Sequence, residues 1–149
     1  MHYTLTGVNT GETRLDEVVI SDDLSGVLDH ATFNDDVAVT VGGREVAAPS
    51  LAGTTLTWSG ALAEGETVTV TYSVTVKTGV TGATLRNVAT STATPPGGET
   101  ITPPPSATDN EVEILAVSGG QFPLWLPLLA LLLLIGGGAL LLRRRSATE

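Results

Sequence analysis

The sequence predicts an all-β domain followed by one transmembrane helix, and three observations support this prediction. Threonine and valine are the most frequent residues of positions 1–121, and aromatic residues make up only 4% of the chain, a composition typical of strands. Polar and apolar residues alternate strictly from Glu66 to Lys77. No charged residue occurs from Phe122 to Leu142, and three arginines follow directly. The first two observations indicate half-buried sheets, and the third indicates a membrane span.

Short predicted strands separated by turns fill the N-terminal half. The first predicted strand, Tyr3 to Val8, ends at the turn cluster Asn9-Thr10-Gly11-Glu12, because Asn and Gly favour turn conformations. Alternating or apolar patterns predict strands over Tyr3 to Val8, Leu15 to Ser21 and Val37 to Val41, and a further short strand that contains Leu56 and Trp58.

Two local signals connect these strands. Asp22 and Ser25 are residue types that cap helix starts, so a short helical turn is expected at Asp22-Asp23-Leu24-Ser25, with Leu24, Val27 and Leu28 on one face. Gly42-Gly43 is a two-residue hairpin turn, and Val46 begins the returning strand.

The clearest strand runs from Glu66 to Lys77. One face carries Val68, Val70, Tyr72, Val74 and Val76, and the other carries Thr67, Thr69, Thr71, Ser73 and Thr75. A period of two over this length predicts a half-buried strand. Its expected partner is Leu85 to Ala93. About seven short strands with turns between them predict an Ig-like antiparallel β-sandwich over residues 1–93.

A proline- and glycine-rich spacer is expected over residues 94–121. Pro95-Pro96-Gly97-Gly98 and Pro103-Pro104-Pro105 favour an extended, semi-rigid chain. Ser106 to Ile114 is either a last strand, which would extend the sandwich to residue 113, or part of the spacer. The sequence leaves both alternatives open.

Residues 122–142 are predicted to form the transmembrane helix. About 20 apolar residues span the hydrocarbon core as a helix, and a soluble helix this apolar would need a much larger protein to bury it. Arg143, Arg144 and Arg145 act as the stop-transfer signal in a cytoplasmic basic tail, residues 143–149, by the positive-inside rule. Residues 1–121 are then expected outside the cell. This localises the chain to the cell membrane as a single-pass protein.

Export requires a signal that the first residues do not supply, since Met1 and His2 lead straight into a strand pattern. We therefore expect the chain to be the end of a longer exported protein; a mis-assigned start is the alternative. A tail-anchored protein with a cytoplasmic domain would leave the arginines on the wrong side.

Charge divides the chain in the same way. The formal net charge is −9, and all acidic residues except Glu149 lie in residues 1–121, which have only four basic residues. So acidic a domain excludes nucleic acid as a partner, because phosphates require a basic face. The chain has no cysteine, so disulfides do not stabilise it.

Several segments, in this order, resemble a known family. They are Tyr3-Thr4-Leu5-Thr6, Asn9-Thr10-Gly11-Glu12, Val18-Val19-Ile20-Ser21-Asp22-Asp23-Leu24, Gly65-Glu66-Thr67-Val68-Thr69-Val70-Thr71-Tyr72 and Leu85-Arg86-Asn87-Val88-Ala89-Thr90. Together they resemble the actinobacterial "domain of unknown function 11" repeats of bacterial surface proteins, over residues 3–113. The resemblance implies a β-sandwich stacked with upstream repeats in stalks or adhesin-like proteins, without enzymatic activity. Against that family pattern, we expect the sandwich to lack its first strand.

The same resemblance makes Asn87 a candidate for a Lys–Asn isopeptide bond, which locks the sandwich in some members of this class. By alternation Asn87 faces the same way as Leu85 and Ala89, so a polar side chain there needs a partner. A hydrogen bond to backbone is the simpler interpretation. The only lysine, Lys77, shares its face with the threonines, and the usual lysine would sit on the missing strand. The bond is therefore not expected in this chain.

A second resemblance concerns the anchor. Leu115, Ala116, Val117, Ser118 and Gly119, followed by an apolar helix and a basic tail, resemble a cell-wall sorting signal. The resemblance implies cleavage by a sortase between Ser118 and Gly119 and transfer to peptidoglycan in the cell wall. Ser118 stands where the Leu-Ala-x-Thr-Gly form has threonine, and a permanent membrane anchor is the alternative.

Catalysis and ion binding receive little support. Asp29 and His30 are adjacent and point different ways, and no nucleophile elbow is present. The pairs Asp22-Asp23 and Asp35-Asp36, the latter with Asn34, are expected in loops. There they are either solvated acids or calcium ligands, although no D-x-[DN]-x-[DN]-G loop is present. Trp58 is either a carbohydrate platform or a core residue.

These observations favour a membrane- or cell-wall-anchored extracellular module of a surface protein, with a stalk or adhesin-like role and no cofactor. The alternative is an extracellular ligand- or carbohydrate-binding module, stabilised by calcium in one version. The expected partners are the membrane, a sortase with peptidoglycan, and upstream repeats of the same protein.

Overall fold

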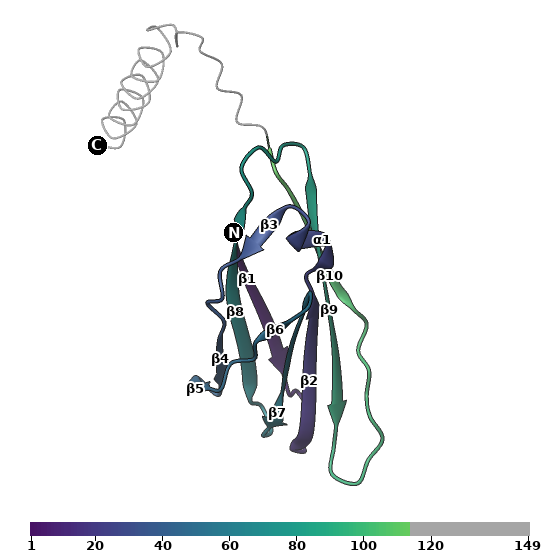
Figure 1. The fold of residues 1–149 in the computed structure, drawn as a ribbon. Helices are drawn as coiled ribbons and strands as arrows, with labels where there is room; N and C mark the ends of the chain where they lie inside the picture. The colour runs from purple at the N-terminus through teal and green to yellow at the C-terminus, as the bar shows by residue number, and fades with distance from the viewer. Residues whose placement is uncertain (114–149) are drawn as a thin grey trace, which may run out of the picture. The chain divides into compact units, whose positions relative to one another are not determined.

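The computed structural model describes residues 1–113, which form two antiparallel five-stranded sheets packed face to face (Figure 1). The strands of the first sheet are ordered β1-β8-β4-β5, with β3 also paired to β8, and those of the second are ordered β10-β9-β2-β7-β6. This arrangement confirms the predicted all-β sandwich.

The elements have the following bounds: β1 His2–Val8, β2 Leu15–Asp23, α1 Ser25–Leu28, β3 Ala31–Phe33, β4 Ala38–Val41, β5 Arg44–Val46, β6 Leu51–Ala52, β7 Thr55–Leu62, β8 Thr67–Val76, β9 Thr84–Thr94 and β10 Ser106–Glu111.

Strand β8 is the centre of the first sheet and follows its predicted alternation. Val68, Val70, Tyr72 and Val74 are buried, whereas the threonines between them lie on the outer face. The strand pairs with β1 along one side and with β3 and β4 along the other. A period of two therefore placed the core residues of this strand correctly.

The hairpin between β4 and β5 turns at Gly42-Gly43, as predicted. Both glycines have positive φ, 57° and 77°, which is the requirement of a type I′ turn. The turn matches the right-handed twist of the two strands that it joins.

Strand β2 continues through Asp22, so the prediction of a loop acid at this position was wrong. Its neighbours β7 and β9 pair with it as far as Asp23, and the Asp22 side chain is fully buried. The helical turn α1 begins after it, at Ser25, where the backbone N–H donates to Asp23 Oδ1 at 2.9 Å.

Trp58 belongs to the core, because it is 7% exposed and alternates with buried Leu56 along β7. It does not form a surface platform, which excludes the carbohydrate-binding role considered for this side chain. Gly60 makes room for its ring: a Cβ at Gly60 would lie 2.5 Å from Trp58 Cζ2.

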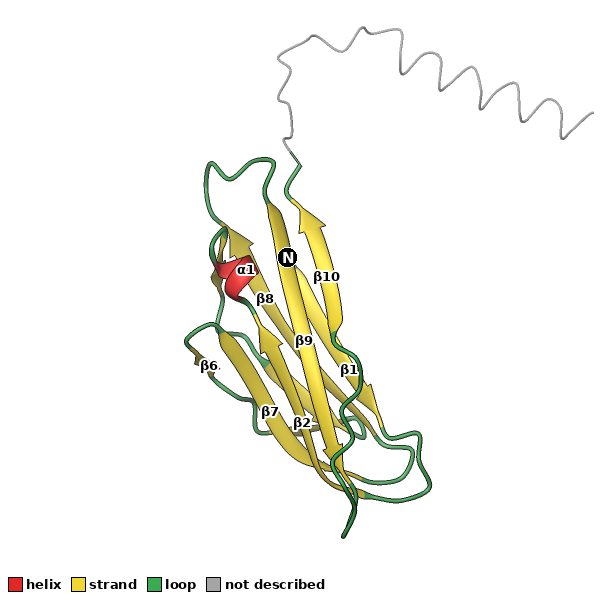
Figure 2. Cartoon of the chain, turned by 90° about the vertical axis from the view of Figure 1, so that its right-hand side faces the viewer, coloured by secondary structure: helices red, strands yellow, loops and turns green. Residues whose placement is uncertain are grey.

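The segment Ser106–Glu111 is a strand, β10, that pairs with β9 at the side of the second sheet (Figure 2). The connection from β9 returns through an isolated bridge between Ala93 and Ile101. Both β1 and β10 are edge strands among the residues described, and each pairs with one neighbour.

Within residues 1–113 no helix has the length and hydropathy that a membrane crossing requires. The predicted span 122–142, the predicted sorting motif Leu115–Gly119 and the arginines 143–145 lie outside the described residues.

Candidate functional site

A cluster of three buried polar side chains joins the two sheets. Asp22 comes from β2, Tyr72 from β8 and Asn87 from β9, and they are 0%, 2% and 4% exposed. The Tyr72 hydroxyl donates to Asp22 Oδ2 at 2.6 Å, and Asn87 Nδ2 donates to the Tyr72 hydroxyl oxygen at 3.1 Å. A hydrogen-bonded cluster in an apolar core links specific strands, because its buried members have to bond to one another.

Strand alternation positions each member. Asp22 follows Ile20 by two residues, so it shares the inward face of β2. Asp22 pairs with Ala89 in the register of β2 and β9, which makes Asn87 its diagonal neighbour on the same face. Tyr72 faces them from the opposite sheet.

Two aromatic rings pack against the ring of Tyr72. Tyr3 on β1 stacks on Tyr72 with ring centroids 5.1 Å apart and an interplanar angle of 12°, and Phe33 lies 5.8 Å away in a tilted arrangement. These contacts fix the Tyr72 ring, so its hydroxyl is held against the Asp22 carboxyl.

The cluster is electrostatically unusual. Burial raises the pKa of Asp22, and the neighbouring Asp23 charge raises it further, whereas the hydrogen bond from Tyr72 and the nearby Asn87 amide lower it. Burial also raises the pKa of Tyr72, as does its hydrogen bond to Asp22. Two oxygens of the cluster, Asp22 Oδ1 and Asn87 Oδ1, have no hydrogen-bond partner.

Asn87 faces inward as its strand pattern predicted, but its amide N–H donates to a side chain and not to backbone. Lys77 has other hydrogen-bond partners: its Nζ donates to the carbonyl oxygens of Leu28 and Asp29 at 2.7 and 3.1 Å. No lysine therefore serves as a hydrogen-bond donor to Asn87 among residues 1–113.

Sequence reasoning missed Asp22 and Tyr72 as the residues that meet Asn87 in the core. The signal was present, since Asp22 continues the period of Val18 and Ile20.

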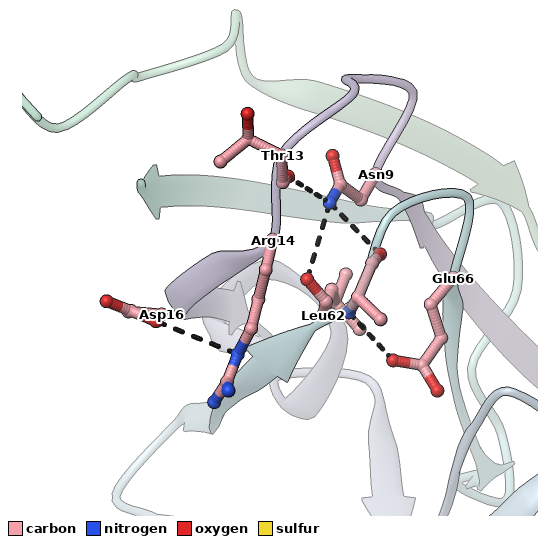
Figure 3. A network of polar contacts seen from close by, with 7 residues as sticks. Asn9, Thr13, Arg14, Asp16, Leu62 and Glu66 are labelled. Atoms are coloured by element: carbon pink, nitrogen blue, oxygen red, sulfur yellow. Dashed lines mark hydrogen bonds and ion pairs between the residues drawn. The ribbon is translucent and has the colours of Figure 1, made fainter. Parts of the chain in front are cut away.

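A second network closes one end of the sandwich around Asn9 (Figure 3). Asn9 is 3% exposed, and its Nδ2 donates to the carbonyls of Thr13, Leu62 and Ala63. Glu66 Oε2 accepts from the Ala63 backbone N–H at 2.9 Å. The network ties the β1–β2 loop to the β7–β8 turn, so it joins the two sheets at this end.

Asp36 is engaged at a break between β3 and β4. Its carboxylate accepts from both the backbone N–H and the hydroxyl of Ser73, whose hydroxyl also accepts from Asn34 Nδ2. The adjacent Asp35 has φ 56°. The Asp36 carboxylate thereby accepts from the Ser73 backbone N–H, in place of the backbone carbonyl of a neighbouring strand. Across residues 1–113, no three His, Asp or Glu side chains gather as metal ligands would.

An uncharged groove of about 370 Å³ opens between β1 and the strands β9 and β10. Its lining includes Leu5, Val18, Ile20, Leu62, Ala89 and Pro103. Threonines from β1, β9 and β10 also line it. Such a groove accepts neutral ligands in preference to charged ones.

Comparisons with known proteins agree with this architecture. A family model described as "Domain of unknown function (DUF7927)" matches residues 1–112. No curated protein matches the chain. Among solved structures, the major pilin subunit BcpA of Bacillus cereus is similar over 72% of this chain, with 18% identity and a TM-score of 0.52. The match spans 33% of the pilin chain, so this chain corresponds to about one third of it.

The collagen-binding domain of a Staphylococcus aureus adhesin is also similar, with 10% identity and a TM-score of 0.50. The match covers 72% of this chain and 85% of that domain. At these identities the two similarities establish a shared sandwich fold.

Proposed function

This chain belongs to the DUF7927 family, a domain of unknown function, and we propose that it is a structural, adhesin-like module of a bacterial surface protein. The observation that carries the proposal is the sandwich itself. A pilin subunit and an adhesin domain have the same fold. The buried side chains of Tyr72 and Asp22 bond one sheet to the other, which suits a module under mechanical tension.

The sequence supports the finer features of this proposal. The order of its segments favours a relationship to the "domain of unknown function 11" surface repeats, and the stretch 122–142 followed by Arg143 favours a membrane anchor. The motif Leu115–Gly119 favours sortase processing at Ser118. In this arrangement the module holds further domains of its protein outside the cell.

Exposure on whole cells tests the proposal. Protease added to intact cells should remove residues 1–113, while a cytoplasmic marker stays intact. Protection of the domain until lysis would contradict a surface location. Mass analysis of wall fragments separates the two anchors: a peptide ending at Ser118 indicates processing, whereas helix-bearing protein alone indicates a permanent anchor.

One observation favours a second candidate, a ligand-binding module, namely the uncharged groove beside β1. Collagen is the probe suggested by the similar adhesin domain. We expect immobilised collagen to retain the wild-type chain and to retain less of Thr108→Trp, whose new ring would fill the groove. Absence of wild-type binding would remove collagen as the ligand.

A further inference from the structure

Two buried oxygens in the core lack a hydrogen-bond donor. They are Asp22 Oδ1 and Asn87 Oδ1, and both side chains belong to the cluster around Tyr72. Asn87 is also the diagonal neighbour of Asp22 on the inward face of the second sheet. A buried acceptor without a donor is costly, so two at one place call for a missing hydrogen.

Counting hydrogens shows that an ionised Asp22 cannot satisfy this cluster. The single hydroxyl hydrogen of Tyr72 goes to Asp22 Oδ2, and one of the two amide hydrogens of Asn87 goes to the Tyr72 oxygen. The second amide hydrogen cannot reach the oxygen of its own amide, so Asn87 Oδ1 would lack a donor even if that hydrogen served Asp22 Oδ1. Exchanging the amide oxygen and nitrogen of Asn87 would supply a donor to Asp22 Oδ1. The same exchange would place the Asn87 oxygen against the Tyr72 oxygen, whose only hydrogen is already used.

One added proton gives every oxygen of the cluster a hydrogen-bond partner. We propose that Asp22 is a neutral carboxylic acid in the folded domain, and that its proton on Oδ1 is donated to Asn87 Oδ1. The three side chains then form a closed ring of hydrogen bonds: Tyr72 to Asp22, Asp22 to Asn87, and Asn87 to Tyr72. The ring crosses from one sheet to the other, so the folded domain carries a proton that helps to hold its layers together.

The charged surroundings agree with a neutral Asp22. On its own strand the adjacent Asp23 is negative and binds the Ser25 N–H. Strands β8 and β1 present the phenols of Tyr72 and Tyr3 to Asp22, and the other titratable residue of β1, His2, is exposed. On β9, Arg86 pairs with Asp109 on the exposed side. From β7 the residue paired with Asp22 is apolar Leu56. Neither ion pair found in residues 1–113 includes Asp22.

The proposal makes stability depend on pH in a definite direction. The folded domain holds the proton more tightly than the unfolded chain, whose aspartates have a pKa of about 3.9. The contribution of Asp22 is therefore fully present below that value and is lost as pH rises through the folded pKa. Asp22 thus stabilises the folded domain more at acidic pH than at neutral pH. An ordinary ion-paired aspartate does the opposite, because its stabilising effect is lost in acid.

Carboxyl-carbon NMR of the full-length chain tests the protonation directly. With isotope-labelled aspartate, the signal of Asp22 should stay at its protonated position above pH 4, where the signal of Asp23 is already deprotonated. Asp22→Asn assigns the signal. Titration of Asp22 at or below the ordinary aspartate pKa would overturn the proposal, and this measurement needs no variant that remains stable.

Unfolding equilibria provide the second test. Asp22→Asn supplies a permanent N–H to Asn87 Oδ1 and keeps an acceptor for Tyr72. The wild-type unfolding constant, divided by that of Asp22→Asn, should rise by up to about tenfold per pH unit between the unfolded and folded pKa values. Asp23→Asn, a neighbouring exposed site, should not reproduce this rise. A ratio that falls with pH would contradict a neutral Asp22.

Discussion

Tyr72 on β8 donates its hydroxyl hydrogen to Asp22 on β2 at 2.6 Å, which bonds one sheet of the sandwich to the other through the core. Because both groups are buried, Tyr72→Phe leaves Asp22 Oδ2 without its donor and Asn87 Nδ2 without its acceptor. We expect the free energy of unfolding to fall by about 1–3 kcal/mol. Denaturant unfolding of the two chains at one pH measures the difference.

Tyr3→Phe is the matched control for that change. Tyr3 stacks on Tyr72, but its own hydroxyl receives only a 3.5 Å bond from Asn110. Its loss should reduce the unfolding free energy by less than about 1 kcal/mol. Equal losses of unfolding free energy in the two variants would mean that the Tyr72–Asp22 hydrogen bond contributes no more to stability than the Tyr3 hydroxyl does.

Asn9→Ala tests the network at the end of the sandwich. The substitution removes the amide that donates to the carbonyls of Thr13, Leu62 and Ala63. Buried carbonyls are then left without donors, so we expect a loss of about 1–3 kcal/mol and faster hydrogen exchange in the β1–β2 loop. Asn110→Ala, which removes only one long bond, is the control. Unchanged exchange in the loop would show that Asn9 does not order it.

Gly60→Ala tests the packing of Trp58. The added methyl group would lie 2.5 Å from Trp58 Cζ2, so the ring or the strand has to move. Overpacking of this kind costs about 1–3 kcal/mol, measured as a lower midpoint of thermal or denaturant unfolding. Gly11→Ala places its methyl group no closer than 3.4 Å to another atom and should leave the midpoint nearly unchanged. A tolerated Gly60→Ala would mean that Trp58 has free space beside it.

The lowered pKa of Asp36 makes its contribution to stability depend on pH in the opposite direction to that of Asp22. Hydrogen bonds from the Ser73 hydroxyl and backbone N–H lower the pKa of Asp36. Its contribution is therefore present above the unfolded aspartate pKa, about 3.9, and is lost as pH falls through the folded pKa. Asp36→Asn should lessen the decline in unfolding midpoint on acidification below about pH 4. A decline as steep as that of the wild type would exclude Asp36 as a source of acid sensitivity.

Local patterns predicted much of the sandwich. The alternation from Glu66 to Lys77 predicted β8 and its inward residues, Gly42-Gly43 predicted the turn of a hairpin, and the phase of β9 predicted that Asn87 faces inward. These features depend on the geometry of a single strand or turn, so neighbouring residues carry the whole signal.

The candidate site was predicted only in part, because its members are far apart in the chain. Asp22 was assigned to a loop since aspartate is rarely buried and since Asp-Asp next to Ser25 suggests a helix cap. Tyr72 appeared as one more apolar residue of an alternating strand. Pairing of β2 with β9, and packing of β8 against both, brings these side chains within bonding distance of each other.

By itself, then, the sequence determined the strand class, the turn positions and the inward or outward phase of each long strand, because periodicity is a property of adjacent residues. The tertiary structure alone decided which strands are neighbours and which buried polar groups meet. Those choices depend on contacts between residues as distant as Asp22 and Tyr72, for which no local pattern exists.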